Sequence, residues 1–182
     1  MLVECRISGF RGLQSRGFCP SFRRMPYQLL YERLPELAEA ETRTITLLED
    51  NVELGLPAGE YAFCEMFCNE PGCDCRRVFF AVTSSPSAEI EAVIAYGWES
   101  AAFYRKWFKS GWTPDDIKLL RGPCLNIGSP ESSYSDALLK LFISVLLPQQ
   151  AYIDQVKRHY RQFRATVDVP RSPLLRRRRT GG

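Results

Sequence analysis

Residues 61–82, YAFCEMFCNEPGCDCRRVFFAV, contain the clearest structural signal of the sequence. Two runs rich in aromatic and apolar residues flank a polar centre, and that centre contains NEPG (69–72). Pro and Gly favour a tight reversal of the chain, so the pattern predicts two strands joined by a turn. Four of the seven cysteines lie inside this stretch and span only twelve positions. The sequence therefore predicts a β-hairpin with thiols at its tip.

Further strands and helices are expected around this hairpin. Strand-like runs occupy 42–50, 60–67, 76–84 and 89–97, and such close spacing favours an antiparallel meander. Helical patterns occupy 27–41 (interrupted by Pro35), 99–108, 113–120, 129–147 and a last segment that opens at Pro148. We therefore predict an α+β fold: a small antiparallel β-meander that carries a Cys-rich knuckle, followed by a C-terminal helical half.

The charge of the chain is unevenly distributed. The net charge is +3, yet residues 1–24 hold five arginines and one acid, and residues 171–182 hold five arginines and no acid. We expect 1–24 to be a disordered leader or a mis-called start, 25–168 to be a single domain, and 169–182 to be a disordered Arg-rich tail. The remaining body is mildly acidic, which argues against nucleic-acid binding except weakly through the tail.

The composition favours a cytoplasmic protein. The apolar content of 45% and charged content of 25% are globular values. The longest apolar run, 137–147, is too short to span a bilayer, and the N-terminus lacks the pattern of a secretory signal. An odd number of cysteines without an export signal indicates a reducing compartment, where clustered thiols are metal ligands or catalysts rather than disulfides. No membrane partner is expected.

Cys68, Cys73 and Cys75 form a C-x4-C-x-C unit that suits a single metal ion. Alternate side chains of an extended segment face the same way, so Cys73 and Cys75 can point to one centre. The turn at 69–72 can bring Cys68 back to that centre. The two arginines after Cys75 would help to keep the thiols deprotonated. Zinc, which binds thiolates in a tetrahedron and usually takes four ligands, is the expected metal.

The fourth ligand is expected to be His159, the only histidine of the chain. Cys64 lies about 13 Å from Cys68 if the strand is extended, so we predict that Cys64 is a buried apolar residue. His159 lies on the last predicted helix, which could carry its ring to the hairpin tip. In the alternative interpretation His159 is no ligand but a partly exposed residue of a basic helix. Cys124 is the reserve candidate for the fourth ligand. A redox role for the cysteines is a weaker interpretation, because the spacing C-x-x-C is absent.

Three segments resemble a family of bacterial proteins to which no activity is assigned. They are LPAGEYAF (56–63), the motif Cys-x4-Cys-Asp-Cys-Arg-Arg (68–77) and Tyr-Gly-Trp-Glu (96–99). The resemblance spans roughly residues 25–163 and excludes Cys64 from the pattern. It implies a family-level domain with a metal knuckle, and it implies no activity.

The segment 96–112 contains seven aromatic residues, which suit either a core or a surface for a protein partner. Glu99 could be an acid in a pocket or a residue of a first helical turn. The sequence shows no nucleophile–base pair and no phosphate-binding loop, so no catalytic residue is assigned. We predict a non-enzymatic binding or adaptor protein with a structural zinc site. Two alternatives stay open: a thiol- or metal-dependent enzyme that uses Cys73 or Cys75, and a nucleic-acid accessory protein that acts through the Arg-rich tail.

Overall fold

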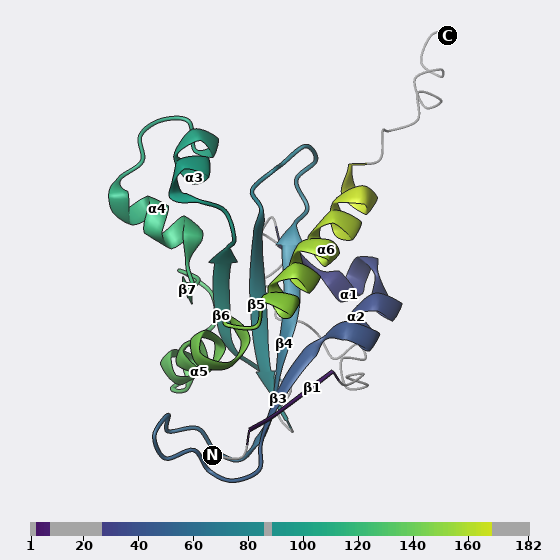
Figure 1. Ribbon diagram of the computed structural model, residues 1–182, viewed down its shortest axis with the longest axis vertical. Helices are drawn as coiled ribbons and strands as arrows, with labels where there is room; N and C mark the ends of the chain where they lie inside the picture. Colours follow the sequence, from purple (N-terminus) through teal and green to yellow (C-terminus); the bar gives the residue numbers. More distant parts are fainter. Residues whose placement is uncertain (1–2, 8–26, 86–88, 169–182) are drawn as a thin grey trace, which may run out of the picture.

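The computed structural model describes residues 3–7, 27–85 and 89–168, and a seven-stranded antiparallel sheet forms its frame (Figure 1). The strands lie in the order β1–β3–β4–β5–β6–β7, and β2 also pairs with β4. The predicted meander corresponds to β3 (Arg43–Leu47), β4 (Gly59–Cys68), β5 (Arg77–Ser84) and β6 (Ile90–Gly97). The shorter strands are β1 (Val3–Ile7), β2 (Tyr27–Leu29) and β7 (Cys124–Leu125).

Most helices follow the meander, which confirms the predicted α+β fold with a C-terminal helical half. Helices α1 (Leu30–Arg33) and α2 (Pro35–Glu41) precede β3. After β6 come α3 (Ala101–Trp107), α4 (Pro114–Arg121), α5 (Ser135–Leu141), the π-helical segment η2 (Phe142–Leu146) and α6 (Gln150–Val167). Helix α6 crosses the sheet, and its C-terminal end lies beside the β4–β5 hairpin (Figure 1). None of the described helices has the length and apolar character needed to cross a membrane.

Local signals set several helix ends. Pro35 begins α2, and Thr113 caps α4 in a capping box with Asp116. The helix predicted over 129–147 begins later than expected, at Ser135. The reason is a tertiary contact: the N–H of Ser132 and the hydroxyl of Ser135 both donate to the carbonyl of Glu91, at 2.8 and 2.9 Å. This contact ties the stretch before α5 to β6.

Each face of the sheet carries its own apolar cluster, because successive side chains of a strand point to opposite faces. The face under α5, η2 and α6 includes Tyr61, Phe63, Phe67, Val78, Phe80, Val82 and Ile94, which pack with Phe142, Tyr152, Val156 and Phe163. The opposite face includes Ala62, Cys64, Met66, Phe79, Ala81 and Val93, which pack with Leu29. Cys64 is buried within this second cluster, which confirms its predicted role as a small apolar residue.

Residues 3–7 correct the expectation of an unstructured leader. They form β1, which pairs antiparallel with β3, with Val3 opposite Leu47 and Ile7 opposite Arg43. VECRI alternates apolar and polar residues as a strand does, and the outer edge of β3 offers backbone groups that need partners. The rest of the predicted leader and the predicted tail, residues 8–26 and 169–182, lie outside the described residues.

Candidate metal centre

The hairpin between β4 and β5 brings the cysteines together. Cys68 is the last residue of β4, and the N–H of Cys73 donates to the carbonyl of Glu70 at 3.2 Å. Gly72 and Arg76 have φ angles of 75° and 48°, in the left-handed region. Glycine reaches this region without strain, whereas arginine does so uncommonly. The two left-handed residues bracket the segment that carries the second and third thiols.

The Sγ atoms of Cys68, Cys73 and Cys75 all lie within 4.8 Å of one another. Cys68 and Cys75 are buried, and Cys73 is half-buried. Thiolates that share one zinc ion at about 2.3 Å in a tetrahedron lie about 3.8 Å apart. A contraction of about 1 Å would therefore bring the three sulfurs to ligand spacing. These three cysteines could hold a metal ion.

The three thiols differ in pKa because they form hydrogen bonds with one another. A hydrogen bond from the Cys75 thiol, opposed by burial, lowers the pKa of Cys68 to about 6; the N–H of Glu70, the Cys73 thiol and Arg164 contribute in the same direction. The pKa of Cys75 is raised by its hydrogen bond to Cys68 and by burial. Burial and the nearby Cys68 also raise the pKa of Cys73. The Cys68 thiolate therefore accepts hydrogen bonds from two thiols, and a divalent cation could replace the protons of those thiols because a coordinating thiol is deprotonated.

The C-terminal end of α6 holds the hairpin tip in place. The buried guanidinium of Arg164 donates to the carbonyls of Cys68 and Glu70, at 2.8 and 3.0 Å, and pairs with Asp168. Asp168 in turn accepts the N–H of Gly72 at 2.9 Å. Arg164 was not among the residues predicted for the site. Its position directly after Phe163, four residues beyond Tyr160, was a signal that it lies on the buried face of the helix.

His159 was predicted to be the fourth ligand, but the structure does not place it with the three thiols. Its ring is buried; Nδ1 lies 2.9 Å from a carboxylate oxygen of Glu65, and Nε2 lies 3.2 Å from Glu41. Helix α6 does reach the hairpin tip, but it reaches it with Arg164. His159 lies five residues earlier, about 7.5 Å back along the helix axis. The described residues that cluster around a possible metal are therefore the three cysteines alone.

The reserve ligand Cys124 also lies outside this cluster. Its thiol donates to the carbonyl of Leu119 at 3.5 Å. Cys19 and the side chain of Cys5 lie outside the described part of the chain. Within the described ranges the candidate centre has three protein ligands, while zinc usually takes four.

Arg76 and Arg77 were expected to keep the thiols deprotonated, but their guanidinium groups bind other partners. Arg76 donates to both carboxylate oxygens of Asp74, at 2.9 and 3.0 Å, and to Glu99 at 3.1 Å. Arg77 donates to the carbonyl of Leu119 at 3.1 Å. The positive charge that lowers the pKa of Cys68 comes from Arg164 instead. Glu99 precedes the N-cap of α3 and is the partner of Arg76, so it is not a residue of a first helical turn.

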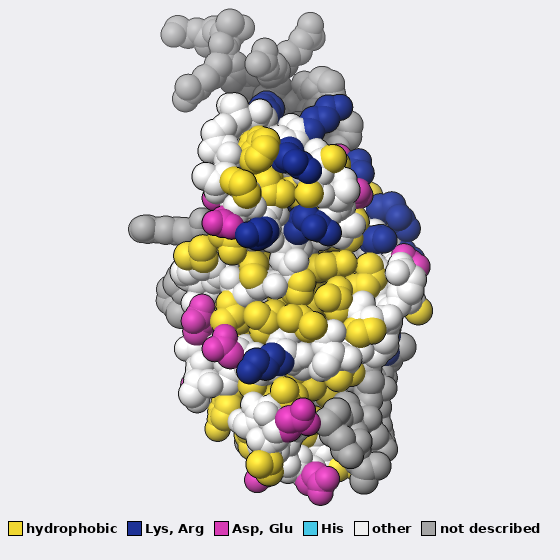
Figure 2. All heavy atoms as spheres, turned by 60° about the vertical axis from the view of Figure 1, so that its left-hand side comes forward, with side chains coloured by type: hydrophobic (Ala, Val, Ile, Leu, Met, Phe, Trp, Pro, Cys, Tyr) yellow, Lys and Arg dark blue, Asp and Glu magenta, His cyan; other side chains and the backbone are white. Residues whose placement is uncertain are grey.

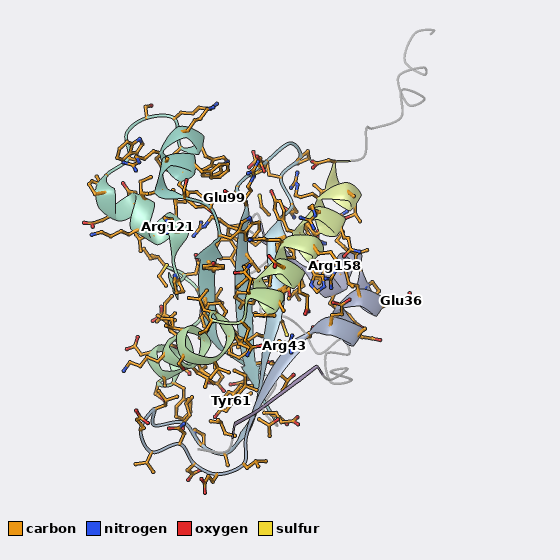
Figure 3. The ribbon with its side chains drawn as sticks, in the orientation of Figure 1. Glu36, Arg43, Tyr61, Glu99, Arg121 and Arg158 are labelled. Carbon is orange, nitrogen blue, oxygen red and sulfur yellow. The ribbon has the colours of Figure 1, made fainter. Side chains whose placement is uncertain are left out.

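The buried histidine should make stability depend on pH. Burial alone lowers the pKa of His159, but the hydrogen bonds and charges of Glu65 on β4 and Glu41 on α2 outweigh it, so the net pKa is raised above 6.5. Arg158, which also pairs with Glu41, is the neighbouring cation, and Figure 3 shows it on the side of α6 toward α2.

A raised pKa means that the charged pair stabilises the fold fully below about pH 6.5, and that this contribution declines as the pH rises through the folded-state pKa. We expect the difference in unfolding free energy between the wild type and His159→Gln to shrink from about pH 6 to about pH 8.5. Urea denaturation at several pH values measures it, and any metal release common to both proteins cancels in the difference. A difference that is constant over this range would show that the pKa of His159 is the same in the folded and unfolded states.

No protein family, no curated protein and no solved structure shows a significant match to this chain. Its function must therefore be inferred from the geometry of the site.

Proposed function

We propose that the protein binds one zinc ion through Cys68, Cys73 and Cys75, and that the ion is structural. The single observation that supports this proposal is the convergence of three Sγ atoms within 4.8 Å at the hairpin tip. Thiolates favour soft metals, and an iron–sulfur cluster would usually require four cysteines. The ion would join the hairpin tip to the end of α6, where Arg164 already holds the backbone of the tip.

We further propose that the protein acts as a non-enzymatic binding or adaptor protein. Hydrophobic side chains gather across the middle of the face that carries α3, α4 and α5 (Figure 2). Phe108 at the end of α3, Leu119 on α4 and Ile127 after β7 are exposed by 43, 40 and 78%. Tyr104, in contrast, is fully buried, so the aromatic segment 96–112 serves both core and surface. The exposed part is the surface that we assign to a protein partner.

A thiol- or metal-dependent enzyme is the second candidate, favoured by the lowered pKa of Cys68. Against it, Cys68 is buried, and the pKa values of Cys73 and Cys75 are raised rather than lowered. Glu99, the acid considered for such chemistry, is paired with Arg76. These observations favour the structural role. The alternative that invokes the Arg-rich tail concerns residues outside the described ranges and stays a hypothesis.

The five cysteines whose side chains are described, Cys64, Cys68, Cys73, Cys75 and Cys124, are all free thiols. Free thiols beside one another suit a reducing compartment. We therefore propose a cytoplasmic location.

Metal analysis of the purified protein tests the proposed function. We expect about one zinc ion per chain in the wild type, and loss of zinc in Cys73→Ser because only two thiolates remain. Cys124→Ser removes a thiol outside the cluster and should retain zinc, as should His159→Gln. Loss of zinc in Cys5→Ser or Cys19→Ser would show that this residue is the fourth ligand of a closed, structural site. Retention in both would leave the fourth position to solvent and strengthen the enzyme alternative. Zinc retained in Cys73→Ser would contradict the assignment.

Arg164 should tune the affinity of the site for metal. It fixes the carbonyls of Cys68 and Glu70, and removing a residue that orients metal ligands typically weakens binding 10–100-fold. We expect Arg164→Gln to weaken zinc binding by roughly this factor in competition with a chromogenic chelator. Arg161→Gln, an exposed change on the same helix, is the charge-matched control and should leave the affinity unchanged. Equal affinities for both variants would mean that Arg164 has no part in the site.

A further inference from the structure

A second concave site lies beside the hairpin tip, between it and α6. This cleft has a volume of about 430 Å³, within the range of small-molecule sites. Asp74, Arg76 and the pair Trp98–Glu99 line one wall, and Figure 3 shows Glu99 near the start of α3. Residues of α6 line the other wall. Trp98 and Glu99 belong to the motif Tyr-Gly-Trp-Glu noted in the sequence, and the proposed metal site does not use this motif.

The first wall is rigid and holds one cation between two carboxylates. Arg76 has a φ of 48°, its carbonyl accepts the hydroxyl of Tyr104 at 2.9 Å, and its guanidinium lies 4.7 Å from the ring centre of Phe103. Two carboxylates, Asp74 and Glu99, pair with its single positive charge, so Arg76 has no charge left for a ligand. Residues held in such uncommon backbone conformations cluster at ligand sites. The wall is therefore organised before any ligand arrives.

The second wall is positive. Lys157, Tyr160 and Arg161 lie on one face of α6, three and four residues apart, and all three line the cleft. Lys157 forms a long ion pair with the exposed Asp154, at 3.6 Å. Among the residues that the structure describes, Arg161 has no ion pair or hydrogen-bond partner. Trp98 is half-buried and packs edge-on against Tyr160, with ring centres 5.2 Å apart. Two cations thus stand beside an indole ring that is fixed in place.

We infer that this cleft binds a small aromatic anion. Its acid group lies at Lys157 and Arg161, and its ring lies against Trp98. The guanidinium of Arg161 suits a carboxylate or a phosphate, because both accept two parallel hydrogen bonds from its fork. Aromatic rings add attraction at offset or edge-on contacts with an indole. The inference rests on the cleft alone and does not depend on the proposed metal.

Titration calorimetry with indole-3-acetate and phenyl phosphate tests the inference and separates a carboxylate from a phosphate ligand. We expect at least one of these anions to bind with a Kd of about 1 mM or tighter. Its matched probes, indole-3-acetamide without the charge and inorganic phosphate without the ring, should bind at least about tenfold more weakly, since a hydrogen bond to a charged group is worth more than that factor.

Variants locate the binding. Arg161→Gln and Lys157→Gln should each weaken the bound anion about tenfold, whereas Arg121→Gln, an exposed change on α4, should have no effect. Arg161 is exposed, so its variant should fold. Binding of neither anion up to about 10 mM, equal binding of the uncharged amide, or equal affinity in Arg161→Gln would each overturn the inference.

Discussion

Replacing Glu65 with alanine is expected to destabilise the protein by about 3–5 kcal/mol, the usual effect of breaking a buried charge pair. The carboxylate lies on β4 with its side chain 3% exposed, 2.9 Å from the ring of His159, which is 1% exposed. Its removal leaves the imidazole buried with one remaining carboxylate, Glu41, and leaves a cavity between β4 and α6. Urea denaturation at about pH 6, below the raised pKa of His159, measures the loss.

Glu60→Ala is the matched control, because Glu60 lies on the same strand but is exposed. Its effect should stay within about 0.5 kcal/mol. A double-mutant cycle that combines Glu65→Ala with His159→Leu should lose less than the two single changes together, because no charge is then left without its partner. A loss below about 1 kcal/mol for Glu65→Ala would mean that the pair does not stabilise α6 on the sheet.

Removing the metal is expected to have the second large effect. An ion that binds only the folded state stabilises it by about 4 kcal/mol when its free concentration is about a thousandfold above Kd. A chelator should therefore lower the melting temperature of the wild type. It should also speed amide exchange in the hairpin tip and in the last turn of α6, which Arg164 and Asp168 join to that tip.

Cys73→Ser should already melt at the lower temperature and should not respond to the chelator. Cys124→Ser, with the same change at a thiol outside the cluster, should respond as the wild type does. If the wild type lost its zinc without any change in melting temperature, the ion would not be structural, and the metal-dependent enzyme would become the better hypothesis.

The hairpin could be predicted because its signals are local. Alternation in β4 and β5 places every second residue on one face, and Pro71 and Gly72 mark the reversal between the strands. The capping box of α4 is likewise complete within four residues. Strands β2 and β7, three and two residues long, are too short to show a period, so nothing local could reveal them.

The site could be predicted only in part, for the same reason. The three cysteines lie within eight residues, so spacing and turn chemistry were enough to group them. The partners of His159 are 94 and 118 residues away in the chain, and no local pattern indicates that a helix will place a histidine opposite Glu65. Arg164 was missed because its role is to bind backbone carbonyls of a distant turn. Helical spacing can place such a residue on the buried face of α6, but it cannot show which distant group the side chain binds, because that contact arises from tertiary packing.

Zinc K-edge X-ray absorption of the purified protein would show whether Cys68, Cys73 and Cys75 bind one zinc ion. The expected result is one zinc ion per chain whose first shell holds at least three sulfur atoms at about 2.3 Å. A protein that carries no zinc after metal-replete preparation, or one whose zinc has fewer than three sulfur ligands, would contradict the assignment of Cys68, Cys73 and Cys75.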